Sequence, residues 1–182
     1  MDAEAFADEL AAAIQYTIRA HSKFSNTPRE AVRLWDSVTP YAIHPIWCAT
    51  TVLTETTLPE SIRYPGYLAL LWHDILEDTQ LGLPPDVRPE VRTLVEEMTF
   101  VNFEDELARL WERSDTTKLL KLYDKTSILL DAAWMSDARW NLVVEHTQKL
   151  LAFVLPNYGE LNIVRMARAI CVMRDSSLVI RD

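Results

Sequence analysis

The sequence predicts an all-α protein, a compact single-domain bundle of about eight helices. Only three of its 182 residues are glycine, and alternating runs of β-branched residues are few. Most segments instead repeat apolar residues every three or four positions, which is the spacing of one helix face. A chain of this length can bury one sizeable core and is short for two domains, so residues 1–182 are expected to form one domain.

The first half of the chain contains two predicted helices separated by a long connection. Apolar spacing predicts a helix over about residues 2–22. Residues 23–39 mix polar and apolar positions, and we expect a loop with a short helix inside it. The pair Thr39 and Pro40 favours a helix start, because a hydroxyl cap precedes a proline at the first helical position. That helix is expected to end near Thr56.

The rest of the chain is predicted to be almost entirely helical. Pro65 and Gly66 indicate a break, after which a strongly apolar helix is expected over residues 67–79. A proline-rich loop over residues 82–89 follows. Further helices are expected at about 88–99, 103–112, 115–134, 136–154 and 159–174. Residues 175–182 are expected to form a flexible tail.

Composition narrows the classes of function. The net charge of −9 argues against binding long nucleic acids, although a bound cation can still attract a small phosphorylated substrate. The sequence has neither a secretory signal nor an apolar run long enough to span a bilayer. Cys48 and Cys171 lie far apart in apolar stretches, which favours reduced thiols. These features predict a cytoplasmic protein that does not enter membranes.

Four polar residues interrupt the predicted helix over residues 67–79, namely His73, Asp74, Glu77 and Asp78. Spacings of three and four place them on neighbouring faces of a helix. A buried carboxylate is costly unless it is paired or binds a cation, so this group favours a nearby cation. The alternative is an exposed helix end at which the acidic side chains are simply hydrated.

His44 and Asp124 are two further polar residues in apolar helices. A lone histidine on an apolar helix is more often a hydrogen-bonded core residue than a metal ligand. Together with His73 and Asp74, however, they supply two imidazoles and two carboxylates. This set suits manganese, iron or zinc with open coordination positions for water.

These residues resemble the H…HD…D signature of the HD phosphohydrolase superfamily. The longer motif HDILEDT, at residues 73–79, is similar to the hydrolase domain of the RelA/SpoT homologues, including the small metazoan SpoT homologues. PYAIHP at 40–45 is similar to the PYxxHP segment of that domain, and LVEEMT at 94–99 and KLLKLYDK at 118–125 resemble its later helices in the same order. The resemblance covers about residues 5–135 and implies the HD-domain fold.

The resemblance also implies an activity. Members of this family remove the 3′-pyrophosphate from guanosine tetra- and pentaphosphate, and some act on other nucleotides. It implies that Glu77 and Asp78 are the catalytic acids that orient or deprotonate the attacking water. It implies one divalent ion, usually manganese, with iron, zinc, cobalt and nickel as alternatives. The ligands would be His44, His73, Asp74 and Asp124.

Two substrate-binding positions depart from the family pattern. The basic segment AHxGQxRK is replaced by AHSKFSNT, followed by an insertion, and Ile128 replaces an asparagine that contacts the nucleotide. Ile128 has no side-chain hydrogen-bonding group to replace that contact. We therefore expect retained hydrolytic chemistry with an altered substrate. Lys23, Arg29 and Lys125 are the candidate substrate contacts, although Lys125 is equally compatible with a hydrated helix lysine.

Three functional hypotheses follow. The first is a metal-dependent phosphohydrolase of a nucleotide phosphate or pyrophosphate ester. The second is a nucleotidase or deoxynucleotide phosphohydrolase. The third is a non-catalytic sensor that binds a nucleotide in the same pocket. A homo-oligomer is compatible with the aromatic-rich residues 134–158.

Overall fold

The computed structural model describes residues 3–173 and confirms the all-α prediction. Within this range the α-helices are α1 (Ala3–Lys23), α2 (Ile43–Leu53), α3 (Glu60–Trp72), α4 (Ile75–Asp78), α5 (Pro89–Met98), α6 (Phe103–Arg109), α7 (Asp115–Leu130), α8 (Asp137–Tyr158) and α9 (Asn162–Ile170). Three short 3-10 helices join them, η1 (Pro28–Ala31), η2 (Leu110–Glu112) and η3 (Ala132–Trp134). The predicted tail lies outside the described residues.

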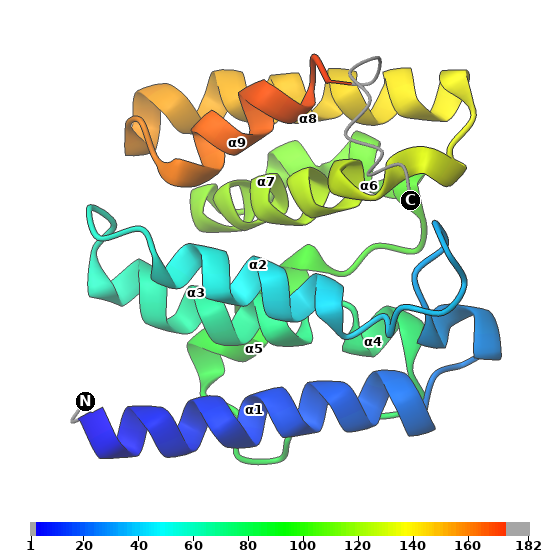
Figure 1. The fold of residues 1–182 in the computed structure, drawn as a ribbon. Coiled ribbons are helices and arrows are strands. Elements are labelled where there is room, and N and C mark those ends of the chain that lie inside the picture. The colour runs from blue at the N-terminus through cyan, green and yellow to red at the C-terminus, as the bar shows by residue number, and fades with distance from the viewer. Residues whose placement is uncertain (1–2, 174–182) are drawn as a thin grey trace, which may run out of the picture.

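The helices stack in layers around α7 (Figure 1). Helix α1 lies along one side of the molecule and packs against α3 and α4. Helices α2, α3 and α5 form the next layer and pack against α7, whose opposite side is covered by α8 and α9. Leu119, Leu120 and Tyr123 of α7 are therefore fully buried in the main core. No helix among residues 3–173 combines the length and apolarity needed to cross a bilayer.

The predicted helix over residues 67–79 is interrupted, and this correction matters for the site. Helix α3 ends at Trp72, and the chain resumes as the single turn α4. Two carbonyl groups at the end of α3 have other partners: the His73 ring bonds the Leu70 oxygen at 2.8 Å, and the Thr17 hydroxyl donates to the Leu71 oxygen at 3.1 Å. These bonds satisfy carbonyls that a continuous helix would use, so the helix ends here.

The expected break at Pro65 and Gly66 was wrong, since α3 runs through both residues. Proline in a helix interior removes one backbone hydrogen bond, and burial of the last two turns of α3 compensates for this loss. Gly66 serves close packing instead. A Cβ atom there would lie 3.2 Å from Leu120 Cδ2, so glycine lets α3 approach α7 closely.

Other predicted helix boundaries also moved: α7 ends at Leu130 rather than at 134, and α9 spans Asn162–Ile170 rather than 159–174. Thr39 does not cap a helix: its hydroxyl donates to Asp36 at 2.6 Å, Pro40 forms an isolated bridge with Val32, and α2 begins only at Ile43. Helix α8 extends past the predicted end at 154 to Tyr158. It stops before Gly159, whose φ of 84° favours glycine.

Candidate metal centre

Three helices bring the predicted ligands to one point. His44 lies in the first turn of α2, His73 and Asp74 occupy the break between α3 and α4, and Asp124 lies in the middle of α7. Helix α2 packs against both α3 and α7. Because the break directs two consecutive side chains toward the α2–α7 contact, residues distant in sequence meet in the interior, where all four are buried.

The facing atoms of this cluster lie within a few ångströms of one another. His73 Nε2 is 3.2 Å from His44 Nε2, 3.1 Å from Asp74 Oδ2 and 3.8 Å from Asp124 Oδ1. His44 Nε2 is 3.5 Å from Asp74 Oδ2 and 3.4 Å from Asp124 Oδ1. One ligand atom each from His44, His73 and Asp124 fits within 4.8 Å of the others, so these residues could hold one ion.

The other polar atoms of the cluster have partners that orient the ligand atoms. His73 Nδ1 donates to the Leu70 carbonyl, and His44 Nδ1 bonds Ser127 Oγ at 2.8 Å, so both Nε2 atoms face inward. Metal-binding histidines commonly have such a bond on the second ring nitrogen. Two nitrogens and two carboxylate oxygens also form the donor set that manganese, iron and zinc accept. The residues present therefore fit a divalent cation.

Asp124 divides its two carboxylate oxygens between different partners. Oδ1 faces the histidines, while Oδ2 accepts from Lys121 Nζ at 3.0 Å and lies 3.2 Å from Lys125 Nζ. Both lysines also contact Glu106 Oε2, at 3.1 and 2.8 Å. The two ammonium groups thus fix the plane of the Asp124 carboxylate and leave one oxygen for the cluster.

Glu77 and Asp78 lie beside the cluster and line a 170 Å³ cleft, which Asp74 and Asp124 also line. Glu77 is exposed on one side, and its Oε1 accepts from the Phe100 backbone N–H at 2.8 Å. The packing of protein around its carboxyl group and the nearby Asp74 raise the pKa of Glu77 to about 7. Burial, Asp74 and Glu77 together raise the pKa of Asp78 to about 7. These carboxyl groups can accept a proton near neutral pH.

Comparisons with known proteins identify the fold. No family model matches the chain, and no curated protein sequence matches it. Among solved structures, a metazoan ortholog of SpoT that hydrolyzes ppGpp and plays a role in starvation responses superimposes with a TM-score of 0.65. It is 23% identical, and the match covers 91% of this chain and 94% of that chain. The chain has the fold of that SpoT ortholog, here called the SpoT-type fold. The resemblance inferred from the HD motifs is thus confirmed at the level of the fold.

The SpoT-type fold does not bring all the predicted substrate contacts to the cleft. Lys23 is exposed at the end of α1, and Arg29 is exposed within η1; neither lines the cleft. Lys125 does line it, but the lysine is buried and paired with Glu106 and Asp124 rather than hydrated. Their roles as substrate contacts stay predictions.

Two long-range side-chain contacts near the site had no signal in the sequence. The residue next to His146 that could pair with it is Glu145. His146 is buried, however, and its Nε2 lies 3.0 Å from Glu106 Oε1. Arg33 makes two bonds to Asp131, at 2.5 and 2.9 Å. Each pair joins residues far apart in the chain, so only the folded SpoT-type bundle reveals it.

Metal binding to this cluster is expected to release protons and to strengthen as pH rises. Although burial opposes its charged form, Asp74 and Asp124 raise the pKa of His73 to about 9, so its imidazole is charged at pH 7. A cation requires the neutral ring and favours ionised Glu77 and Asp78. Affinity should therefore be lowest below pH 6 and increase through pH 7 and 9. Titration calorimetry with Mn²⁺ in buffers of different ionisation enthalpy tests this. An observed binding enthalpy at pH 7.5 that is the same in every buffer would mean that no protons are released and would contradict the prediction.

Proposed function

We propose that the protein is a metal-dependent phosphohydrolase that cleaves a phosphate or pyrophosphate ester of a small nucleotide-like molecule. The observation that supports this most directly is the meeting of two histidines and two aspartates beside two further carboxyl groups in one cleft. His44, His73, Asp74 and Asp124 would hold one divalent ion, with manganese as the first candidate. The solved SpoT ortholog hydrolyzes ppGpp on the same fold, which supports this class of reaction.

The chemistry divides between the ion and the protein. When bound, a divalent cation supplies positive charge that acidifies a water molecule and neutralises a phosphoryl oxygen. Glu77 and Asp78 stand at the edge of the same cleft, where a carboxylate can orient the water and accept its proton. The water oxygen forms a bond to phosphorus as the phosphorus–oxygen bond to the leaving group breaks. The leaving oxygen takes up a proton as it departs.

Basic side chains near the cleft complete the site. The Arg139 guanidinium lies 4.1 Å over the Phe103 ring, and both residues line the cleft. Its ion pair with Glu104 is long, at 4.0 Å. Arg139 is therefore placed to bind a phosphate that extends from the metal ligands, in the bidentate manner that arginine favours.

A phosphatase panel tests the proposal. Purified protein is incubated with Mn²⁺ and guanosine tetraphosphate, nucleoside triphosphates, NADPH or 3′-phosphorylated nucleotides, and phosphate or pyrophosphate release is measured. Turnover of at least one compound, abolished by a chelator and restored by Mn²⁺, is expected. Binding of nucleotides without turnover of any would favour the non-catalytic sensor.

Replacing the acidic pair should separate catalysis from metal binding. Glu77→Gln and Asp78→Asn are each expected to lower kcat by about 10²-fold or more, since general-base catalysis contributes that much, while metal content stays unchanged. Glu90→Gln on α5, an exposed residue outside the cleft, is the matched control and should keep full activity. Unchanged kcat in both acidic-pair variants would remove these residues from the mechanism.

A further inference from the structure

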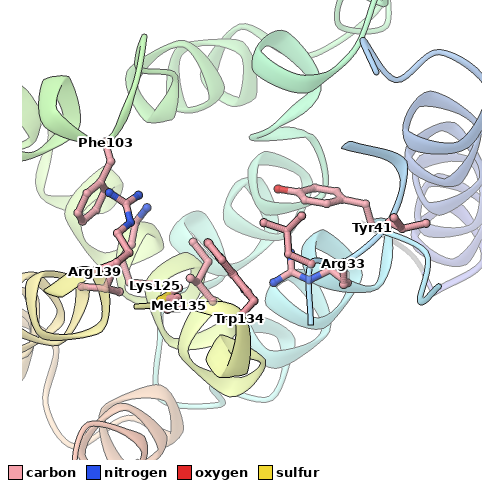
Figure 2. Close-up of a pocket in the computed structure, with 11 residues that line it drawn as sticks. Arg33, Tyr41, Phe103, Lys125, Trp134, Met135 and Arg139 are labelled. Atoms are coloured by element: carbon pink, nitrogen blue, oxygen red, sulfur yellow. The ribbon is translucent and has the colours of Figure 1, made fainter. Parts of the chain in front are cut away.

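A second pocket, here called the side pocket, adjoins the cleft. Figure 2 shows it with Phe103, Lys125 and Arg139 on one side, Arg33 and Tyr41 on the other, and Trp134 and Met135 between them. Five of its lining residues also line the cleft, so the two cavities share a wall. These five are Tyr41, Phe103, Lys125, Ile128 and Arg139. A substrate with its phosphate at the metal ligands can therefore extend into the side pocket.

The side pocket has the size of one ring. Its volume is 180 Å³. A protein cavity of about 150 Å³ lined by apolar side chains accepts one benzene molecule. The side pocket thus has room for a nucleobase ring.

The lining is apolar between two cationic ends. Val32, Leu34, Ile128, Trp134, Met135 and Val143 supply apolar surface. The lining residues include no carboxylate, amide or small hydroxyl side chain, and the Tyr41 hydroxyl donates its hydrogen to Asp74 at 2.7 Å. The pocket therefore presents few side-chain acceptors for N–H groups of a ligand.

The cations at the two ends are donors, and two of the three are held in place by carboxylates. Arg33 uses Nε and one Nη atom on Asp131, which leaves its second Nη atom for another acceptor. Lys125 is paired with Glu106 and Asp124. Arg139 is stacked on Phe103. A ring that carries carbonyl oxygens can accept from these guanidinium groups.

We propose that the side pocket holds a uracil or thymine ring of the substrate, an assignment that rests on the proposed phosphohydrolase function. Each is a single ring with two carbonyl oxygens and one ring N–H once attached to the sugar. Uracil and thymine therefore leave one N–H without a side-chain acceptor among the lining residues, whereas cytosine and adenine leave two and guanine leaves three.

Five substrates that differ only in the base test the assignment. The 3′,5′-bisphosphates of uridine, thymidine, cytidine, adenosine and guanosine are compared with Mn²⁺ for phosphate release. We expect kcat/KM for uridine and thymidine to exceed that for guanosine by at least about tenfold, because an unpaired donor costs at least that factor. A guanosine substrate equal to or better than uridine would overturn the assignment. Phenyl phosphate as the best substrate would also overturn the assignment, because the pocket would then prefer a hydrocarbon ring without carbonyl groups.

A matched pair of variants tests whether the side pocket determines the uridine-over-guanosine ratio of kcat/KM. Ile128→Asn adds a carbonyl acceptor to the lining and should reduce the uridine-over-guanosine ratio at least threefold. Leu130→Asn, two residues along on the exposed side of α7 and absent from the lining, should leave the ratio unchanged. Equal ratios in the two variants and the wild type would overturn the assignment.

Binding to an inactive protein separates this inference from the proposed function. Glu77 does not line the side pocket, so metal-loaded Glu77→Gln should retain its ligand preference. Calorimetry is expected to give a tighter Kd for uridine bisphosphate than for guanosine bisphosphate. If no nucleotide is hydrolysed by wild type yet this order holds, the hydrolase proposal fails and the pocket assignment stands. If turnover is found but guanosine binds as tightly, the reverse is true.

Discussion

Replacing His73 by alanine is expected to remove the bound metal and to lower kcat/KM by about 10³-fold or more, because a ligand and its charge stabilisation are lost together. Wild-type protein should contain about one transition-metal ion per chain when measured by elemental analysis. The His73→Ala variant should contain almost none. Asp124→Ala should behave in the same way, since its Oδ1 faces both imidazoles.

His21→Ala is the matched control for this experiment. His21 is buried and lies against the Tyr41 ring with centroids 4.9 Å apart, so its removal also deletes a buried imidazole near the site. It is not one of the residues that converge on the ion position, and its variant should keep the metal. Full occupancy in His73→Ala, or equal loss in both variants, would contradict the ligand assignment.

The second large effect is expected at Glu106, which has no proposed contact with substrate. This buried carboxylate bonds Lys121 and Lys125 through one oxygen and His146 through the other. Burial alone would raise the pKa of Glu106, but the two lysines hold it well below its ordinary value. Glu106→Gln leaves two buried ammonium groups sharing Asp124 and should lower the free energy of unfolding by about 3–5 kcal/mol.

Urea denaturation measures this loss, and Glu104→Gln is its control. Glu104 lies two residues earlier on α6 with a side chain 74% exposed, so its variant should change stability by less than about 0.5 kcal/mol. We also expect the Glu106→Gln variant to bind Mn²⁺ more weakly. Without the Glu106 carboxylate, Asp124 is the only carboxylate that pairs with the two lysines, so less of its negative charge is available to the metal ion. A Glu106→Gln protein as stable as wild type would show that the buried charges are neutralised in another way.

The parts of the site that sequence could predict are those that conflict with their local surroundings. His73, Asp74 and Asp124 lie among the apolar residues of predicted helices. Burying such a side chain costs free energy unless it has a partner, so the sequence indicates partners even without knowledge of the fold. Their meeting in one cluster then follows from helices that pack against each other. Apolar spacing also predicted the ends of α1 to within about one residue. A long apolar face without proline or glycine favours a continuous helix over other structures.

The parts that sequence could not predict depend on partners from elsewhere in the chain. At the end of α3 the His73 ring bonds the Leu70 carbonyl, but the Leu71 carbonyl is bonded by Thr17 on α1, which lies 54 residues away in the sequence. Pro65 is accommodated because burial of α3 outweighs one lost hydrogen bond. The carboxylate partner of His146 lies 40 residues away on another helix, so the local sequence does not indicate it.

The buried pair of Arg33 and Asp131 has a consequence for how the molecule assembles. These residues are 98 positions apart, and contacts of such separation form late, after the cost of closing a long loop has been met. The guanidinium borders the side pocket, so this wall is complete only when the segment before α2 has docked onto the end of α7. A ligand bound there should therefore slow global unfolding by holding together two segments that lie 98 positions apart in the chain.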